Sequence, residues 1–263
     1  MTTHPLEPTA TDFLAQQGDI AFQANLYDDP NPTRRGLHCA RRDWVQDRLA
    51  RYVERGSRLL EIGVGCGIFT RHLTEQGAKV MAVDVNQAFL DGVSDLSDVE
   101  VINADATRDF GARDIDVALL SEVLEHVPRD GSVGMLQTIY DALKPGGVLV
   151  LTTPQRFSTM ELTARLLKLP PVLALARKIY GAADELGHIN LLTSGVLKKQ
   201  IARAGFEIVE EDLFGFYLPG VAEFGGEAGA GLLQRTGRLF KKTPVLRHLI
   251  WTQGYVLAKP LGA

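Results

Sequence analysis

Five short apolar runs, rich in β-branched residues, alternate with helical segments between residues 57 and 153. Each run is shorter than an ordinary helix and is bounded by turn residues, so each is predicted to be a buried strand. Strands that alternate with helices form parallel sheets through right-handed crossovers. The sequence therefore predicts an α/β fold with a mostly parallel sheet flanked by helices. The five runs are SRLLEIG (57–63), AKVMAVD (78–84), VEVIN (99–103), IDVALLS (115–121) and GVLVLTT (147–153).

Two further strands are expected near the end of the chain. They lie in ARAGFEIVEEDLFGF (202–216) and WTQGYVLAKP (251–260), with a loop-rich stretch between them. Because no long crossover joins the two, an antiparallel pair at the edge of the sheet is predicted.

The chain divides into an extension and a main domain. Residues 1–55 are predicted to form a helical N-terminal extension or cap, and residues 56–263 the main domain. Lid-like insertions are expected at about 155–190 and 215–247. Both follow the carboxyl ends of strands, where open α/β sheets bind ligands.

Composition and charge exclude several classes of protein. The chain has 263 residues, of which 45% are hydrophobic, and this is enough for one substantial core. The net charge of -4 gives no global attraction for nucleic acid, so no nucleic-acid partner is expected. Cys39 and Cys66 form neither a ligand pair nor a disulfide framework, which favours a reducing compartment. The first thirty residues carry four aspartates and lack an apolar signal region, and no long uncharged apolar stretch follows, so a cytoplasmic location is expected.

The stretch LLEIGVGCG (59–67) places three glycines at alternate positions between a strand and a helix expected from about Ile68. Such a loop leaves backbone N–H groups unpaired, and the missing Cβ atoms let a ligand approach. Asp84 ends the next strand, where an acid can accept hydrogen bonds from ribose hydroxyls. A dinucleotide fingerprint would require glycine at position 68, so a different nucleotide cofactor is indicated. Glu61, two residues before the first glycine, suits a cationic ligand end such as an ammonium group.

These residues resemble the class I S-adenosylmethionine-dependent methyltransferases over about residues 55–155, and are similar in particular to the ubiquinone-biosynthesis-type small-molecule O-methyltransferases. Five motifs match in order: EIGVGCG (61–67), Asp84, NADA (103–106), SEVLEHV (121–127) and LKPGGVLVLTTP (143–154). The resemblance implies a seven-stranded sheet whose last strand is antiparallel. It also implies S-adenosylmethionine as the cofactor, held by Glu61, Gly63, Gly65, Gly67, Asp84, Val85, Asp105, Ala106, Ser121 and Arg41.

Arg41 is included because a basic residue before the first strand often meets the carboxylate of the cofactor in this class. Arg34 and Arg42 are the alternatives on the same amphipathic helix. An arginine–carboxylate fork requires one of these side chains to face inward.

The activity implied by the resemblance is methyl transfer to a small, apolar or aromatic molecule. A hydroxyl oxygen, in particular of a phenol or catechol, is the leading acceptor. SEVL stands where amide and adenine N-methyltransferases often carry Asn-Pro-Pro-Tyr, which argues against those substrates. A C- or N-methyltransferase of a small metabolite, and a non-catalytic subunit with the same fold, remain alternatives.

The motif SEVLEH suggests a metal site. Glu122, Glu125 and His126 are spaced i, i+3 and i+4, so in a helix they would share one face. With His188 as a fourth ligand they could hold magnesium, manganese or zinc, and such a metal would favour the phenolate form of an acceptor. In the alternative, no metal binds and His188 acts alone as the base. His188 and His126 are the catalytic candidates.

The first insertion is the candidate for contacts with partners. RFSTMELTARLLKLPPVLALARKIYG (156–181) has five basic residues, one acid and leucines at helical spacing. This composition predicts a lid over an apolar substrate, or a helix that lies on an anionic membrane surface. The sequence leaves the oligomeric state open.

Overall fold

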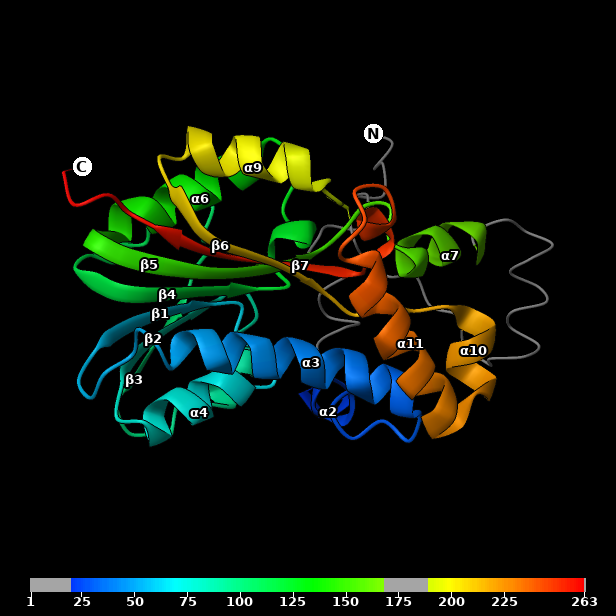
Figure 1. The fold of residues 1–263 in the computed structure, drawn as a ribbon. Helices are drawn as coiled ribbons and strands as arrows, with labels where there is room; N and C mark the ends of the chain where they lie inside the picture. The colour runs from blue at the N-terminus through cyan, green and yellow to red at the C-terminus, as the bar shows by residue number, and fades with distance from the viewer. Residues whose placement is uncertain (1–19, 168–188, 263) are drawn as a thin grey trace, which may run out of the picture.

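A single seven-stranded sheet forms the centre of the protein (Figure 1). The computed structural model describes residues 20–167 and 189–262. The strand order is β3-β2-β1-β4-β5-β7-β6, and β7 runs antiparallel to both of its neighbours. The predicted fold class and the late antiparallel pair are thus confirmed. The strands are β1 (Arg58–Ile62), β2 (Lys79–Asp84), β3 (Val99–Asn103), β4 (Ile115–Ser121), β5 (Leu143–Pro154), β6 (Glu207–Phe214) and β7 (Thr252–Ala258).

The central strands are apolar on both faces because helices cover both sides of the sheet. Leu59 of β1 belongs to one core cluster, together with Leu73, and is fully buried. Its neighbour Leu60 belongs to the other cluster, together with Ile139. Successive side chains of a strand point to opposite faces, so a continuous apolar run is what a doubly covered strand requires.

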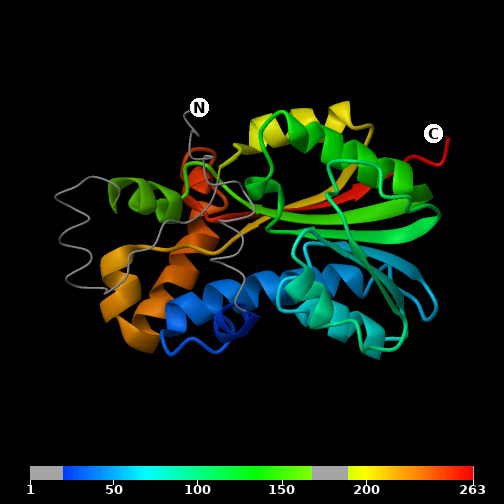
Figure 2. The ribbon, with the colours of Figure 1, turned by 180° about the vertical axis from the view of Figure 1, so that it is seen from behind.

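Figures 1 and 2 show which helices cover each face. Helices α6 and α9 lie on one face, while α3 and α4 lie on the other. Helix α5 shares the face of α4, because its Phe89 and Leu90 belong to the same core cluster as Leu73. Asn31 caps the start of α3 by accepting hydrogen bonds from the backbone N–H groups of Thr33 and Arg34. The bounds are α3 (Pro32–Leu49), α4 (Ile68–Glu75), α5 (Gln87–Asp91), α6 (Gly131–Ala142) and α9 (Ser194–Arg203).

A second group of helices lies beyond the end of the sheet at which β4 and β5 finish (Figure 1). It contains the first half of α3 and most of the second insertion. A separate apolar cluster holds it together and includes Leu37 of α3, Leu233 of α11, Phe216 and Trp251. The N-terminal extension and the second insertion therefore meet above the strand ends. The other elements of this group are α2 (Ile20–Asn25), α7 (Thr159–Leu167), α10 (Pro219–Phe224), α11 (Gly226–Phe240) and the 3-10 helix η2 (Leu246–Leu249).

None of the helices in the described part of the chain has the length and apolar character that crossing a bilayer requires.

Candidate cofactor and acceptor site

The glycine loop joins β1 to α4, as predicted. Gly63, Gly65 and Gly67 have φ values of 80°, 54° and 73°, which side chains rarely allow. Neighbouring side chains crowd the loop as well. A Cβ on Gly63 would lie 2.2 Å from Val123, and one on Gly67 would lie 2.5 Å from Val93. Glycine is therefore required at these positions for two reasons. The backbone is left-handed, and neighbouring side chains leave no room for a Cβ atom.

Helix α2 lies against this loop. A Cβ on Gly65 would be 2.4 Å from the side-chain oxygen of Gln23. The N-terminal extension thus reaches the middle glycine of the loop, and it covers the place where the sequence predicts a cofactor.

Glu61 is buried at the end of β1 with only part of its hydrogen-bonding capacity used. Thr70 donates to Oε2 at 2.7 Å, whereas no hydrogen bond within the described chain reaches Oε1. Burial, with a smaller contribution from Asp84, raises the pKa of Glu61 to about 8. An orphaned buried carboxylate oxygen is costly, and a cationic ligand group would relieve that cost. The residue therefore fits the predicted ammonium contact.

Asp84 ends β2 beside the same loop. Its Oδ2 accepts the backbone N–H of Val64 at 2.8 Å, and its Oδ1 accepts that of Asn86 at 2.8 Å. Burial raises its pKa against these hydrogen bonds. Backbone N–H groups of Gly65 and Val85 also stabilise this carboxylate, which holds it beside the glycine loop. Val85 follows with half of its side chain exposed, which leaves an apolar surface for a base ring.

The remaining predicted cofactor residues have structural partners. Asp105 closes a turn, because its Oδ1 accepts hydrogen bonds from the backbone N–H and the hydroxyl of Thr107. Ala106 is buried in the core, and the hydroxyl of Ser121 lies 3.0 Å from that of Thr152. The cofactor roles of Asp105, Ala106 and Ser121 remain predictions.

The structure separates the three candidate arginines. Arg34 and Arg42 form ion pairs with other acids and lie partly in solvent. Arg41 is only 9% exposed, and its Nη1 lies 3.2 Å from Oε2 of Glu122. Its Nη2 also donates to the hydroxyl of Tyr27 at 3.4 Å, and no described residue accepts from its Nε. Arg41 is therefore the inward arginine that the prediction required.

The expectation of one helical face for Glu122, Glu125 and His126 is wrong. Only a short 3-10 turn, η1 (Leu124–His126), forms here. Glu122 precedes it with a left-handed φ of 56°, which turns this residue away from the direction of a helix.

The two glutamates consequently point to different partners. Glu122 faces Arg41, while Glu125 is fully buried and accepts a hydrogen bond from Thr153 at 3.0 Å. Within residues 20–167 and 189–262, no group of three His, Cys, Asp or Glu side chains could hold a metal ion. His188 lies outside the described residues, so its proposed roles as base and as metal ligand remain predictions.

The structure adds two residues that the sequence did not single out. His38 packs edge-on between Trp251 and Tyr27, with ring centroids 5.6 and 6.2 Å away. Burial and the nearby charge of Arg41 lower the pKa of His38 to about 3, so the ring is neutral. Its Nδ1 and the Trp251 indole N–H are buried and make no hydrogen bond to the described chain. We call the connected set of Tyr27, His38, Arg41, Glu122 and Trp251 the aromatic–polar cluster.

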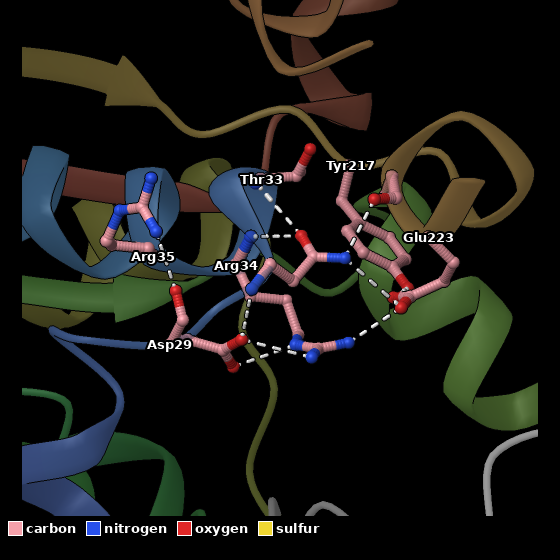
Figure 3. A network of polar contacts seen from close by, with 8 residues as sticks. Asp29, Thr33, Arg34, Arg35, Tyr217 and Glu223 are labelled. Atoms are coloured by element: carbon pink, nitrogen blue, oxygen red, sulfur yellow. Dashed lines mark hydrogen bonds and ion pairs between the residues drawn. The ribbon is translucent and has the colours of Figure 1, made fainter. Parts of the chain in front are cut away.

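A second polar network, which we call the clamp, holds the N-terminal extension to α10 (Figure 3). Glu223 accepts hydrogen bonds from Arg34 at 2.6 Å and from the hydroxyl of Tyr217 at 2.7 Å. Arg34 also donates to Asp29, and the side-chain amide of Asn31 donates to the backbone of α10 at 2.9 Å. The clamp fixes the turn that precedes α3, and α3 in turn carries Arg41 and His38.

Comparison with known proteins supports the resemblance to methyltransferases that the sequence motifs indicate. The model of a family described as "Methyltransferase domain" matches residues 34–211. The carboxy-S-adenosyl-L-methionine synthase of Aeromonas hydrophila is 31% identical over 170 residues, which cover 59% of this chain and 68% of the relative. The ubiquinone biosynthesis O-methyltransferase of Pseudomonas entomophila is 31% identical over 122 residues, or 43% of this chain and 50% of the relative.

Solved structures share the fold at low sequence identity. The [4+2]-cyclase SpnF has a TM-score of 0.62 at 18% identity, with both chains fully covered. The N-methyltransferase NodS of Bradyrhizobium japonicum, solved with S-adenosyl-L-homocysteine, has a TM-score of 0.58 at 15% identity, covering 95% of this chain and 98% of NodS. The family match spans well over half of the chain, and the glycine loop, Glu61, Asp84 and Arg41 fit the cofactor of that family. The chain belongs to the methyltransferase domain family and is an S-adenosylmethionine-dependent methyltransferase of small molecules.

Proposed function

We propose that the enzyme transfers a methyl group from S-adenosylmethionine to a hydroxyl oxygen of a small apolar or aromatic molecule. The observation that carries this proposal is the aromatic–polar cluster, which combines aromatic rings with buried polar atoms that the described chain leaves unpaired. Unpaired buried polar atoms are costly and are normally satisfied by a ligand or by water. The similarity to a ubiquinone biosynthesis O-methyltransferase supports the choice of oxygen as the acceptor.

Different residues around the glycine loop bind different parts of the cofactor. Glu61 binds the ammonium group, Arg41 the carboxylate, Asp84 the ribose hydroxyls, and Val85 packs against the adenine. When bound, the cofactor supplies an electrophilic methyl group on a sulfonium. The protein contributes alignment, and well-aligned reactants gain effective molarities on the order of 10⁵–10⁸ M.

The aromatic–polar cluster supplies two described groups that can receive a hydrogen bond from an acceptor hydroxyl. His38 is neutral, so its Nδ1 can accept, and Glu122 has a carboxylate oxygen with no hydrogen bond to the described chain. Trp251 and Tyr27 provide aromatic surface beside them. His126 and His188 remain the catalytic candidates predicted from the sequence, with His188 as the predicted base.

The test combines binding with product analysis. Calorimetry first measures S-adenosylmethionine affinity, and a screen of phenols, catechols, amines and carbon acids then follows S-adenosylhomocysteine and the methylated product. We expect phenols or catechols to give methyl ethers. Cofactor binding without S-adenosylhomocysteine from any acceptor would favour a non-catalytic subunit, and methylation confined to amines or carbon acids would contradict the hydroxyl acceptor.

Variants then assign the roles of the polar groups. His38→Gln and Glu122→Gln should both lower turnover. The His38 variant should change cofactor affinity little, whereas the Glu122 variant also removes the charge paired with Arg41, so a change in its cofactor affinity reports on that pair. His248→Gln, an exposed histidine on η2, is the matched control. The same assay in chelator, followed by addition of magnesium, manganese or zinc, tests the metal predicted at Glu122, Glu125, His126 and His188.

A further inference from the structure

The outer side of α11 and the segment that follows it expose apolar side chains to solvent. Leu232 and Leu239 are 56% and 66% exposed, and Val245 is 78% exposed. In Figure 1 no other element lies between α11 and the viewer. We call this surface the basic–leucine face, and it comprises Leu232, Arg235, Arg238, Leu239, Lys242, Val245 and Leu246.

Helical geometry explains why these leucines are exposed. The inner side of α11 is formed by Ala230, Leu233 and Gly237, which pack on the helical group above the strand ends. Leu232 and Leu239 are two turns apart, so they lie in one row along the helix and away from that inner side. The solvent side of α11 therefore carries apolar and basic side chains together. Packing within the protein does not explain why leucines lie on this side.

The charge of this region is opposite to that of the whole chain. Residues 228–250 contain five basic residues and no acid, whereas the chain carries a net charge of -4. Lys241 and Arg247 pair with Asp212 and Glu211 of β6. For Arg235, Arg238 and Lys242, no ion pair forms with any residue that the structure describes. Three cations therefore flank the exposed leucines without an ion pair to the described part of the chain.

A recess of about 330 Å³ continues the basic–leucine face toward α9. Its lining includes Lys242 from the face, together with Lys198, Lys241, Arg247 and His248. Lys198, Lys241 and Arg247 pair with Glu211 and Asp212 of β6, so Lys242 is the lining cation that remains for a phosphate-bearing group among the described residues.

We propose that the basic–leucine face binds the surface of a bilayer that contains anionic lipids. The leucines and Val245 insert shallowly between headgroups, while Arg235, Arg238 and Lys242 lie against lipid phosphates. Exposed apolar side chains in a row, flanked by cations, are the features that place a helix in the interface of a membrane. A nucleic acid would use the cations but would leave the leucines in water. This membrane contact is independent of the acceptor chemistry.

The test measures binding of the full chain to vesicles by flotation. Vesicles of phosphatidylcholine with about one third phosphatidylglycerol should bind the protein at low salt, and pure phosphatidylcholine vesicles should bind it much less. Binding should weaken as salt rises, because screening acts on the cationic part of the contact. Absence of binding to the anionic vesicles at low salt would overturn the proposal.

Two variants separate the apolar and cationic parts. Leu232→Ser with Leu239→Ser, and Arg235→Gln with Arg238→Gln and Lys242→Gln, should each weaken vesicle binding at least about tenfold. The control for the second is Arg55→Gln with Arg58→Gln and Lys79→Gln. It makes the same charge change at exposed positions near the opposite ends of the strands and should stay within about twofold.

Undiminished binding of the leucine variant would overturn the lipid assignment, since a contact made only by cations suits a polyanion instead. Equal losses in the cationic variant and its control would also overturn it, because the effect would then follow net charge. Unchanged thermal melting and S-adenosylmethionine affinity show that each variant is folded.

Discussion

The guanidinium of Arg41 lies 3.2 Å from the carboxylate of Glu122, and both side chains are largely withdrawn from solvent. Arg41 comes from the N-terminal extension, whereas Glu122 follows β4. The pair therefore joins the extension to the strand end beside which the acceptor must lie. No residue in 20–167 or 189–262 accepts a hydrogen bond from the Nε of Arg41, so Arg41 can bind a ligand carboxylate while it stays near Glu122.

Replacing Arg41 by glutamine should weaken S-adenosylmethionine binding by about tenfold to a hundredfold, because a charge-assisted contact contributes about 1.5–3 kcal/mol. Arg42→Gln is the matched control, since Arg42 lies on the same helix and pairs with Asp43 in a partly exposed position. Calorimetry with S-adenosylmethionine measures both. If Arg41→Gln, like its control, stayed within about twofold of the parent, the carboxylate role would be excluded.

Glu61 should make stability depend on pH. Its pKa rises from 4.5 to about 8 on folding, so the folded state holds a proton that the unfolded state has lost between these values. Its contribution to stability is complete below about pH 4.5 and is lost as the pH rises toward 8. Glu61→Gln should therefore become more stable relative to the parent between about pH 6 and pH 8, by at least about 1 kcal/mol. Urea unfolding across this range measures the difference.

The exposed carboxyl of Glu100 provides the control for that measurement. Glu100→Gln makes the same chemical change at a solvent-exposed site and is measured over the same pH range. A parallel pH dependence for Glu61→Gln and the parent would show that Glu61 is ionised in the folded protein.

Local sequence predicted the sheet well, because short apolar runs with turn residues at their ends determine buried strands. All five early runs became strands, and the glycine loop lies where the spacing placed it. The spacing of Glu122, Glu125 and His126 in SEVLEH places these side chains on one face only if the segment is helical. The structure turns the chain there instead, since the N–H of Glu122 donates to Thr152 and Val123 packs against Gly63. These contacts are distant in sequence, and a local pattern cannot contain them.

The aromatic–polar cluster was missed for the same reason. His38 and Trp251 come from opposite ends of the chain, and only the packing of α3 above the strand ends brings their rings together. No spacing rule links them. A single histidine within an amphipathic helix gives no signal of a site.

His38 should make the protein sensitive to acid. Its pKa falls from 6.5 to about 3 on folding, so the unfolded state binds a proton that the folded state lacks between these values. The contribution to stability is present above about pH 6.5 and is lost as the pH falls toward 3. His38→Phe should remove this loss, so its stability relative to the parent should improve between about pH 6 and pH 4. Denaturant unfolding at several pH values measures it, and a constant difference would exclude a buried neutral His38.

Gly63→Ala should destabilise the protein by about 1–3 kcal/mol, because it combines a left-handed backbone with a contact of 2.2 Å to Val123. Gly231→Ala is the control, since no atom lies within 4 Å of its added Cβ and its position is helical. That change should be neutral or stabilising, by up to about 1 kcal/mol. Thermal melting compares the two. In the double variant Gly63→Ala with Val123→Ala, the added Cβ no longer meets the Val123 side chain. This variant should regain the stability lost through that contact, but not the stability lost through the left-handed backbone.

The clamp should stabilise the N-terminal extension on the main domain. Glu223 accepts from both Arg34 and Tyr217 in a partly buried position, so Glu223→Gln removes one charge and leaves a donor where acceptors are needed. We expect a loss of about 1–3 kcal/mol in the free energy of unfolding. Glu227→Gln is the control. Glu227 pairs with Arg35 at 3.1 Å but is mostly in solvent, where such pairs contribute little.

Because α3 carries Arg41, the Glu223 variant should also weaken S-adenosylmethionine binding, whereas the Glu227 variant should not. Equal effects of the two substitutions on melting and on cofactor affinity would show that the clamp does not position α3.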